Sequence, residues 1–383
     1  MLPFDFQPRT RIVFGEGKID SLGELASELG ARRTLVVSDP GIIAAGHTQR
    51  GIDALQKAGI ETFLFDSVQE NPSTTDVEAG VKFAQRHEPQ LIVGLGGGSS
   101  MDCAKGINFV YSNGGRMQDY WGVGKALKEM LPMIAVPTTS GTGSETQSFA
   151  LISDAETKVK MACGDKKAAC RVALLDPSLT VTQPKRITAL TGIDAIAHAL
   201  ETFVTTKRNA ASLSFSREAW LLLAENFATV LEHPEDLNAR GGMQLGACFA
   251  GMAIENSMLG ATHALANPLT AHYGIVHGQA IGAMLPHVIR YNGQEFAAWY
   301  VDLLEVTAHS NGCPAPSGGP EALAEYVATL VRKAGLPGRL SEMGVSSEKL
   351  STLAADASKQ WTGGFNPRPV DAAALESIYH AAF

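Results

Sequence analysis

The chain has few cysteines and no long apolar run. Its 383 residues include five cysteines, an odd number without a CxxC pair, which fits reduced thiols in a cytoplasmic protein better than a disulfide framework. The five are Cys103, Cys163, Cys170, Cys248 and Cys313. No apolar run approaches the ~18 residues of a membrane-spanning helix, and the first nine residues lack the basic start and apolar stretch of a signal peptide. The sequence therefore predicts a cytoplasmic protein without a membrane partner.

An excess of positive charge is also absent. The net charge of -8 argues against nucleic acid or an anionic membrane surface as the main partner. Hydrophobic residues make up 45% of the chain and charged residues 18%, as in a globular protein with an ample core. A chain of 383 residues is too long for one ordinary core, so two domains are expected.

The two halves of the chain have different patterns. Between about residues 10 and 180, short β-rich runs alternate with helical stretches, which predicts a parallel sheet wrapped by helices. The expected strands are Arg11–Phe14, Thr34–Ser38, Glu61–Phe65, Leu91–Gly94, Met133–Val136 and Val172–Leu175, and the expected helices are Ile19–Leu29, Thr74–His87 and Ser99–Tyr111.

Beyond Pro184 the strand-like runs stop and helical patterns take over. The expected helices are Ala211–Leu231, Gly242–Ile254, Glu295–His309, Gly319–Lys333 and Asp371–Ala382. We therefore predict an α/β domain over residues 1–182, Rossmann-like in its parallel sheet, and an all-helical domain over 183–383.

One constellation of side chains indicates chemistry. Asp194 and His198 are four residues apart, which places them one turn apart on one helix face and suits two ligands of one metal ion. His263 and His277 follow in short segments punctuated by glycine and proline. One carboxylate and three neutral imidazoles make a metal site with room for a substrate oxygen.

Two loops are suited to phosphate. Glycines 96–98 follow an expected strand and precede an expected helix, which Ser99 or Ser100 can cap. The third glycine of a G-x-G-x-x-G fingerprint is replaced by Ser99, so a plain tight turn is an equal alternative. Residues 136–145, VPTTSGTGSE, form a second loop rich in hydroxyls and glycine after another strand. Two such loops in one sheet favour a nucleotide site.

Asp39 ends an expected strand. A carboxylate at this position can hydrogen-bond a ribose diol and repel a 2′-phosphate, which would favour NAD over NADP. The alternative interpretation is a helix or turn cap before Pro40.

Several motifs in order resemble the iron-containing (group III) alcohol dehydrogenase family, which shares its fold with dehydroquinate synthase and glycerol dehydrogenase. They are GGGSSMD (96–102), PTTSGTGSE (137–145), TGIDAIAHALE (191–201), His277-Gly followed by LPHVIRYN (285–292), and NPRP (366–369). The resemblance runs over essentially the whole chain. It implies that residues 1–182 form a dinucleotide-binding α/β domain and residues 183–383 an all-helical metal and substrate domain, with the metal and substrate site in the cleft between them.

The resemblance also implies roles for individual residues. Asp194, His198, His263 and His277 would be the metal ligands. Phe149 would lie near the nicotinamide. The implied NAD contacts are Asp39, Asn71, Gly97, Gly98, Ser99, Asp102, Thr138, Thr139, Thr142, Phe149, Lys160 and Leu179, with Lys160 reaching a ribose hydroxyl or a phosphate.

The chain departs from the family pattern at Asn267. The family often has His-x-x-x-His where this chain has His263-Ala-Leu-Ala-Asn267, so a candidate proton carrier is replaced by a side chain that cannot titrate. His272 is a candidate to face the substrate, and His287 is expected to be a packed helix residue or a cap.

Together these observations predict a metal-dependent alcohol dehydrogenase or aldehyde reductase that transfers hydride between NAD(H) and a small primary alcohol or aldehyde. Fe²⁺ suits the ligands, and Zn²⁺ is the alternative because it binds such sites at least as tightly. Two other interpretations stay open: a relative acting on another carbonyl or polyol, such as maleylacetate or glycerol, and a non-catalytic nucleotide- or metal-binding relative. A homodimer or larger homo-oligomer is implied by the resemblance alone.

Overall fold

The computed structural model describes residues 3–310 and 318–383, so Cys313 lies outside the described residues. The chain forms two compact units. One unit contains Gln7–Thr139 and Gly143–Gln183, and we call it the sheet unit. The other contains the segment up to Phe6, the short segment Ser140–Thr142 and Pro184–Phe383, and we call it the helical unit.

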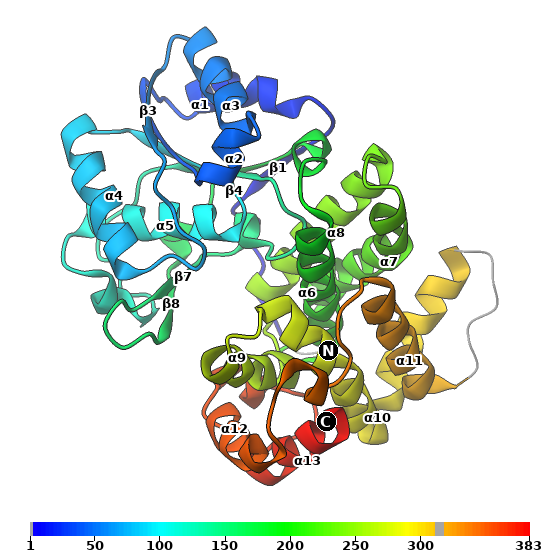
Figure 1. Ribbon diagram of the computed structural model, residues 1–383. Helices are drawn as coiled ribbons and strands as arrows, with labels where there is room; N and C mark the ends of the chain where they lie inside the picture. The colour runs from blue at the N-terminus through cyan, green and yellow to red at the C-terminus, as the bar shows by residue number, and fades with distance from the viewer. Residues whose placement is uncertain (1–2, 311–317) are drawn as a thin grey trace. The chain divides into compact units, whose positions relative to one another are not determined.

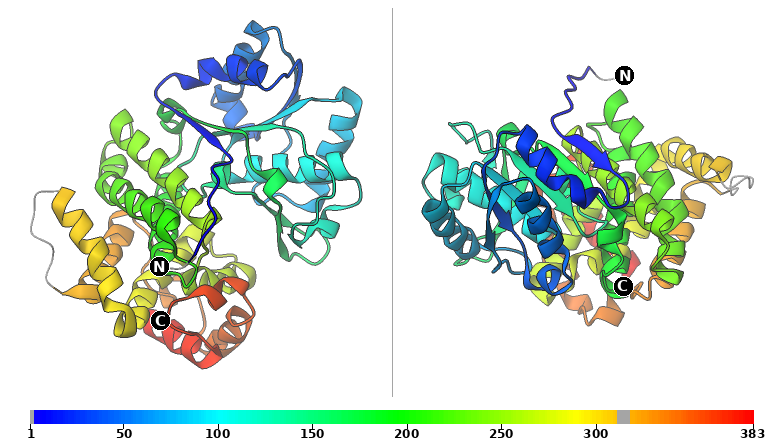
Figure 2. Two further views of the ribbon diagram at one scale, coloured as in Figure 1. Left: turned by 180° about the vertical axis from the view of Figure 1, so that it is seen from behind. Right: turned by 90° about the horizontal axis from the view of Figure 1, so that it is seen from above.

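A six-stranded parallel sheet forms the centre of the sheet unit (Figures 1 and 2). Its strands, in spatial order, are β1 (Arg11–Phe14), β9 (Val172–Leu175), β6 (Met133–Pro137), β4 (Leu91–Gly96), β2 (Arg33–Val37) and β3 (Glu61–Phe65), and every neighbouring pair is parallel. The expected strands therefore all exist, with bounds that differ by at most two residues.

Helices cover both faces of this sheet, as parallel strands require. They are α1 (Leu22–Glu28), α2 (Pro40–Ala44), α3 (His47–Lys57), α4 (Thr74–His87) and α5 (Gly98–Asn113), with the 3-10 helices η1 (Lys18–Ser21), η2 (Met117–Tyr120), η3 (Ser144–Thr146), η4 (Lys166–Ala168) and η5 (Pro177–Thr180). Val36 of β2 packs into a core with Leu55 of α3. Its neighbour Val37 points to the other face and packs into a second core with Val77 of α4.

The chain changes direction across the sheet between β2 and β4. From β2 the chain moves outward to β3, and it then returns to the other side of β2 to form β4 and, beyond it, β6. Loops at the carboxyl ends of strands on either side of such a point diverge and leave a crevice where ligands bind in doubly wound folds. Asp39 follows β2 and Gly97 follows β4, so both loop regions indicated by the sequence lie at this point.

A second, three-stranded sheet was not predicted. Its order is β5 (Gly122–Val123), β8 (Lys160–Gly164) and β7 (Phe149–Ser153), with β7 and β8 antiparallel. β5 has only two residues, and six residues without an Asn-Gly or Asp-Gly pair connect β7 to β8, so no hairpin signal marks this sheet in the sequence.

The helical unit packs its helices around α6. They are α6 (Lys185–Val204), α7 (Ala210–Glu232), α8 (Leu237–Glu255), α9 (Ala261–Tyr273), α10 (His277–Ser310), α11 (Gly319–Lys333), α12 (Leu350–Ala357) and α13 (Ala372–Ala382), with the 3-10 helices η6 (Ser341–Met343), η7 (Ser347–Lys349) and η8 (Trp361–Phe365). By length and apolar composition alone α6 could cross a membrane, contrary to the expectation that no segment would, but 89% of its apolar window is buried inside the structure.

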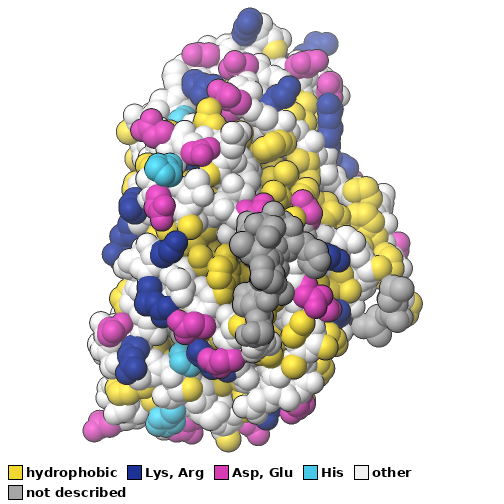
Figure 3. All heavy atoms as spheres, turned by 90° about the vertical axis from the view of Figure 1, so that its right-hand side faces the viewer, with side chains coloured by type: hydrophobic (Ala, Val, Ile, Leu, Met, Phe, Trp, Pro, Cys, Tyr) yellow, Lys and Arg dark blue, Asp and Glu magenta, His cyan; other side chains and the backbone are white. Residues whose placement is uncertain are grey.

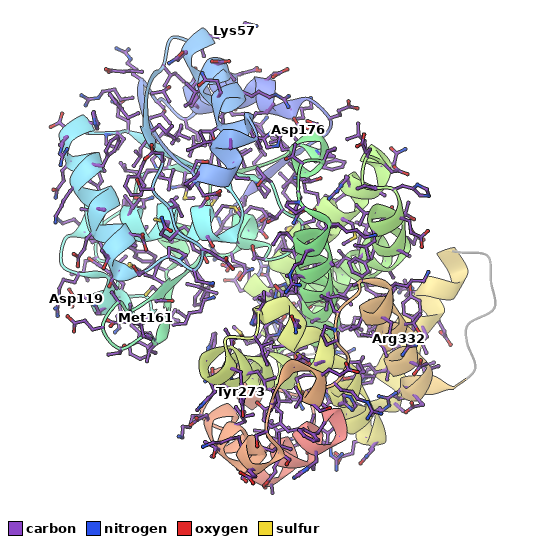
Figure 4. The ribbon with its side chains drawn as sticks, in the orientation of Figure 1. Lys57, Asp119, Met161, Asp176, Tyr273 and Arg332 are labelled. Atoms are coloured by element: carbon purple, nitrogen blue, oxygen red, sulfur yellow. The ribbon has the colours of Figure 1, made fainter. Side chains whose placement is uncertain are left out.

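The segments around His263 and His277 are longer helices than their punctuation indicated. Pro268 lies inside α9 and Pro286 inside α10. α9 ends at Tyr273, which is labelled in Figure 4 and whose hydroxyl accepts a hydrogen bond from the Ser346 amide at 3.2 Å. Burial of the apolar faces of both helices outweighs the roughly 3 kcal/mol that an interior proline costs.

The four described cysteines, Cys103, Cys163, Cys170 and Cys248, are free and buried. Burial raises the pKa of the Cys163 thiol to about 12 and that of the Cys170 thiol to about 11, so these thiols are protonated and unreactive.

On the face drawn in Figure 3, acidic and basic side chains lie interspersed.

Candidate functional site

Three helices bring the predicted metal ligands together in the helical unit. Asp194 and His198 lie one turn apart on α6, His263 is the third residue of α9, and His277 is the first residue of α10. One ligand atom each from Asp194, His263 and His277 lies within 4.8 Å of the others. His198 joins this group through Asp194 and through its ring, which stacks on His263 with centroids 4.9 Å apart.

The spacing of the ligand atoms fits a single cation. Nε2 of His198 and Nε2 of His263 each lie 3.5 Å from Oδ1 of Asp194, and Nε2 of His277 lies 3.6 Å from the same oxygen. Ligands about 2.1 Å from a metal ion at tetrahedral angles are separated by about 3.4 Å. The three contacts therefore have the separation of metal ligands and are too long for good hydrogen bonds.

Two of these atoms are buried without a hydrogen-bond partner among the described residues: Oδ1 of Asp194 and Nε2 of His263. Burial alone would raise the pKa of Asp194, but the imidazoles of His198, His263 and His277 outweigh it and hold this pKa well below its usual value. An ionised buried carboxylate surrounded by imidazole nitrogens is a donor set that a divalent cation satisfies when the imidazoles give up their protons.

Glu201 is a member of this cluster that we did not predict. It lies on α6, seven residues after Asp194, and is 4% exposed. Its Oε2 is 2.5 Å from Nδ1 of His263, and its Oε1 accepts a hydrogen bond from the Thr262 amide at 2.6 Å. With the Nδ1 proton donated to Glu201, the Nε2 lone pair of His263 is free for a metal. Its place three residues after His198, on the same helix face, was the available sequence signal.

A glycine allows α10 to bring His277 close to α6. A Cβ atom at Gly278 would lie 2.2 Å from the carbonyl oxygen of Leu190, closer than any real contact. The first turn of α10 therefore packs directly against the backbone of α6. The exposed fraction of the His277 side chain is 37%, against 7% for His198 and 6% for His263, so the cluster is open to solvent at His277.

The first glycine loop of the sheet unit packs tightly between its neighbours. Gly96 has φ +150°, and a Cβ there would lie 2.5 Å from Oγ of Ser100 and 3.0 Å from Oδ2 of Asp39. A Cβ at Gly97 would lie 3.3 Å from the Thr139 methyl group. Gly97 is the N-cap of α5 and supplies no capping side chain. The expectation that Ser99 or Ser100 caps this helix is wrong, because both lie inside its first turn.

Asp39 has the capping role that was the alternative interpretation. Its Oδ1 accepts hydrogen bonds from the amides of Gly41 and Ile42 at the start of α2, and its Oδ2 accepts one from Ser100 at 2.9 Å. The side chain is half-buried, and Oδ2, which accepts one hydrogen bond, keeps a second lone pair, so this role leaves room for a ribose hydroxyl at Oδ2.

Three predicted nucleotide contacts form one group beside α5. Asn71 has a left-handed backbone with φ 53°, and its amide donates to Oγ of Ser99 at 3.1 Å. Nζ of Lys160 donates to Oδ1 of Asn71 at 3.3 Å. Asn71 and Lys160 are exposed and Ser99 is half-buried, so all three are accessible to a ligand.

A buried lysine links Asp102 to the second loop. Lys105 is 0% exposed, and its ammonium donates to the carbonyls of Ser144, Gln147 and Phe149 and to the hydroxyl of Ser144. The Ser144 hydroxyl in turn donates to Oδ1 of Asp102 at 2.8 Å. Lys105 therefore holds the backbone of residues 144–149 and, through the Ser144 hydroxyl, the carboxylate of Asp102, which is a predicted nucleotide contact. The sequence did not reveal this role.

The remaining predicted contacts have different surroundings. Gly98 is the first residue of α5, and Thr142 groups with the helical unit. The Phe149 ring packs on Gly164, where a Cβ would lie 2.3 Å from it. Thr138 is 2% exposed, with a hydroxyl that has no partner among the described residues. Leu179 is fully buried in the core under β1 and β9, which leaves only its backbone for a ligand.

Comparison with known proteins identifies the family of the chain. The sequence model of the iron-containing alcohol dehydrogenases matches residues 8–177, and that of the C-terminal part of the same family matches residues 188–383. The chain belongs to the iron-containing alcohol dehydrogenase family.

Relatives within this family are similar over nearly the full chain. The NAD-dependent methanol dehydrogenase of Bacillus methanolicus is 32% identical over 93% of both chains. The 1,3-propanediol dehydrogenase of Klebsiella pneumoniae is 32% identical over 99% of both. The crystal structure of a 1,3-propanediol oxidoreductase superposes with a TM-score of 0.94 at 31% identity, covering all of both chains.

Membership confirms the predicted fold class, an α/β nucleotide-binding part followed by an all-helical part, and the predicted chemistry. The protein is an NAD-dependent oxidoreductase that acts on alcohols and aldehydes, in a family that uses NAD(H) and Fe²⁺.

The structure also gives the surroundings of Asn267, where the chain departs from the family pattern, and of the histidines His272 and His287. Nδ2 of Asn267 donates to Oε1 of Gln360 at 3.0 Å, and Oδ1 of Asn267 has no hydrogen-bond partner among the residues that the structure describes. His272 is engaged at the surface by Asp356 at 2.8 Å, so the expectation that it faces the substrate is not supported. His287 packs inside α10, where burial and nearby Arg290 lower its pKa to about 4.

The Lys105 group generates a first prediction. Ser144→Ala removes the hydroxyl that joins Lys105 to Asp102, and we expect a threefold to tenfold rise in the KM for NAD, which corresponds to about 1 kcal/mol for one hydrogen bond. Metal content should be unchanged. The control is Ser112→Ala, which removes a hydroxyl on α5 that bonds only to Asn108. Equal KM values for the two variants would contradict the role assigned to this group.

Proposed function

We propose that Asp194, His198, His263 and His277 hold one catalytic Fe²⁺ and that the protein oxidises small primary alcohols or reduces the matching aldehydes with NAD(H). One observation carries the proposal. Three imidazole nitrogens from three helices surround one buried carboxylate oxygen at 3.5–3.6 Å, the separation expected of ligands to a common ion.

A divalent cation bound there would supply Lewis-acid polarisation of an alcohol or carbonyl oxygen, which lowers the pKa of the alcohol or activates the carbonyl for hydride. The residues of the chain supply the rest. Glu201 keeps His263 in the tautomer whose Nε2 can bind metal. Burial of His198 and His263 excludes water from one side of the site, and the exposed side at His277 admits the substrate. Zn²⁺ can occupy the same ligands, so metal availability decides between the two ions.

We propose that the nucleotide lies along the loops at the carboxyl ends of β2, β4 and β6. The uncapped amides at the start of α5 attract the pyrophosphate, Asp39 accepts a hydrogen bond from a ribose hydroxyl, and Lys160 with Asn71 binds a further ribose or phosphate oxygen. The proposed contacts are Asp39, Asn71, Gly97, Gly98, Ser99, Asp102, Thr138, Thr139, Thr142, Phe149, Lys160 and Leu179. Their support is the strand order and the accessible polar groups at this edge of the sheet.

We also propose a cytoplasmic homodimer or larger homo-oligomer, without a nucleic acid or membrane partner. The four described cysteines are free and the net charge is -8, which supports this assignment. β1 lies at the edge of the six-stranded sheet, where β9 is its neighbour among the described strands. Light scattering of the purified protein tests the assembly, and a monomeric mass at micromolar concentration would contradict it.

The metal assignment is tested by His263→Ala and His277→Ala. Each removes one ligand, so bound metal should fall well below one ion per chain and turnover should drop by more than about a thousandfold, since the proposed Lewis acid is lost. The control is His272→Ala, which alters the same helix as His263 at its exposed pair with Asp356 and should keep metal and activity. Full metal content and activity in the ligand variants would refute the site.

Asp39 is tested by Asp39→Asn. This change keeps an oxygen for the amides of Gly41 and Ile42, so the cap on α2 persists, but it removes the charge that repels a 2′-phosphate. The ratio of kcat/KM for NAD to that for NADP should fall by about tenfold or more, or about 1.4 kcal/mol. A wild-type protein that uses both cofactors equally well, or a variant with an unchanged ratio, would show that Asp39 only caps the helix.

Asn267 is tested by Asn267→His. The residue lies one turn beyond His263 on α9, and an imidazole there can accept the alcohol proton only when neutral. The variant should keep its metal, and its kcat/KM for alcohol oxidation should fall as pH drops below about 6.5, an inflection that the wild type lacks. Asn267→Gln is the matched control, because it alters size without adding a titratable group. Superimposable pH profiles for all three proteins would show that this position does not face the reaction.

A further inference from the structure

Helix α9, which carries His263, begins without a capping side chain of its own. Its N-cap is Gly260. The first amides of the helix are instead satisfied by two side chains from distant parts of the helical unit: Thr262 donates to Oε1 of Glu201 at 2.6 Å, and Ala261 donates to Oδ1 of Asn366 at 3.3 Å. His263 is the next residue. The position of its ring therefore depends on where these two oxygens lie.

Asn366 is itself held by a second buried amide. It pairs with Asn292 of α10 through two reciprocal hydrogen bonds, with Nδ2 to Oδ1 distances of 2.7 Å and 3.1 Å. Asn366 also donates to the carbonyl of Arg368 at 2.6 Å, and Asn292 donates to the hydroxyl of Tyr300 at 3.1 Å. Asn366 is 4% exposed and Asn292 is 1% exposed. Because every donor and acceptor of the pair is engaged, Oδ1 of Asn366 is fixed facing α9.

The three groups meet at one glycine. A Cβ atom at Gly260 would lie 3.1 Å from Oε1 of Glu201 and 3.1 Å from Oδ1 of Asn366. Gly260 has a negative φ of -139°, so the lack of space beside these two oxygens, rather than a left-handed backbone, favours glycine here. The start of α9 thus closes on both capping oxygens with no room to spare.

The segment that carries Asn366 is anchored to α10 outside this contact. The Arg368 guanidinium stacks 3.9 Å from the ring centroid of Tyr291 and donates to the carbonyl of Tyr291 at 2.9 Å. The Tyr291 hydroxyl donates to the carbonyl of Pro369 at 2.8 Å. The motifs LPHVIRYN and NPRP, which contain none of the proposed metal or nucleotide ligands, are therefore joined to each other.

We infer that Asn292 and Asn366 are positioning residues of the metal centre. They set the start of α9 against Glu201, and through that contact they set the distance and tautomer with which His263 meets the metal. The inference rests on the proposed role of His263 as a ligand. It gives a function to the motifs LPHVIRYN and NPRP. Asn366, which lies more than one hundred residues after His263, holds the start of α9 in place.

The test is the rate at which a chelator removes metal from the purified holoenzyme. Asn366→Ala leaves the Ala261 amide without its acceptor and breaks the pair with Asn292, so metal release should quicken by about threefold to tenfold, at the lower end of what removing a partner of a metal ligand produces. The Co²⁺-substituted protein should show a shifted visible absorption spectrum. The controls are Tyr326→Phe, which removes a hydroxyl that donates to the carbonyl of Ala224, and Ser214→Ala, which removes a hydroxyl that donates to the carbonyl of Ala210. Both hydroxyls lie in the helical unit outside the contacts of Asn292 and Asn366, so both variants should stay within twofold of wild type.

A second variant, Gly260→Ala, approaches the same contact from the other side and serves if Asn366→Ala does not fold. Its Cβ must push both capping oxygens away, so it should change the metal release rate and the Co²⁺ spectrum in the same direction. Combined with Glu201→Gln, Asn366→Ala should add less than its single effect, because both changes act through one helix end.

The outcomes separate the two proposals. If Asn366→Ala and Gly260→Ala unfold at a lower temperature but release metal at the wild-type rate with an unchanged Co²⁺ spectrum, these residues serve stability alone and the inference is wrong. If the wild-type protein binds no stoichiometric metal, the proposed function itself fails. Faster release with an altered spectrum in both variants, but in neither control variant, supports the inference.

Discussion

Compensation of buried charge is the constraint on which the helical unit depends. Helix α6 is almost wholly buried and apolar, yet one of its faces carries Asp194, His198 and Glu201. An isolated buried carboxylate is strongly unfavourable, and the unit contains two close together. Glu201 is stabilised by His263 and by backbone amides at the start of α9. Among the described residues, three imidazoles face the carboxylate of Asp194 and lower its pKa, and the proposed cation would complete the compensation of its charge. The packing of α9 and α10 against α6 follows from this need.

The sheet unit also contains a buried charge, but here the charge is positive. Lys105 is a fully buried cation, and its charge is met by three backbone carbonyls, the Ser144 hydroxyl and the nearby Asp102 carboxylate. Burial raises the pKa of Asp102, and Lys105 counters that rise. In both units an ion inside the core organises backbone that would otherwise be loop: the end of a helix in one, and residues 144–149 in the other.

The sequence revealed the parts of this arrangement that are local. A spacing of four residues on one helix was enough to associate Asp194 with His198, and strand, glycine turn and helix follow one another directly around Gly97. Partners distant in sequence left no periodic signal. Glu201 was visible within its motif, but its contact with His263 is made across 62 residues, and Asn366 reaches Ala261 across 105. The resemblance to a family supplied the ligand set, whereas only the three-dimensional structure shows what holds each ligand in its tautomer and place.

Because the proposed ligands come from three helices, a bound ion would also be a cross-link. Gly278 brings α10 against the backbone of α6, and the start of α9 closes on Glu201, so the distances that fix the coordination sphere are the same distances that fix the core. Binding to the folded state alone adds stability by mass action, about 4 kcal/mol when the free ion is a thousand times its Kd. The stability of the fold would then depend on the supply of iron. In cells short of the metal, the enzyme would be both inactive and more readily degraded.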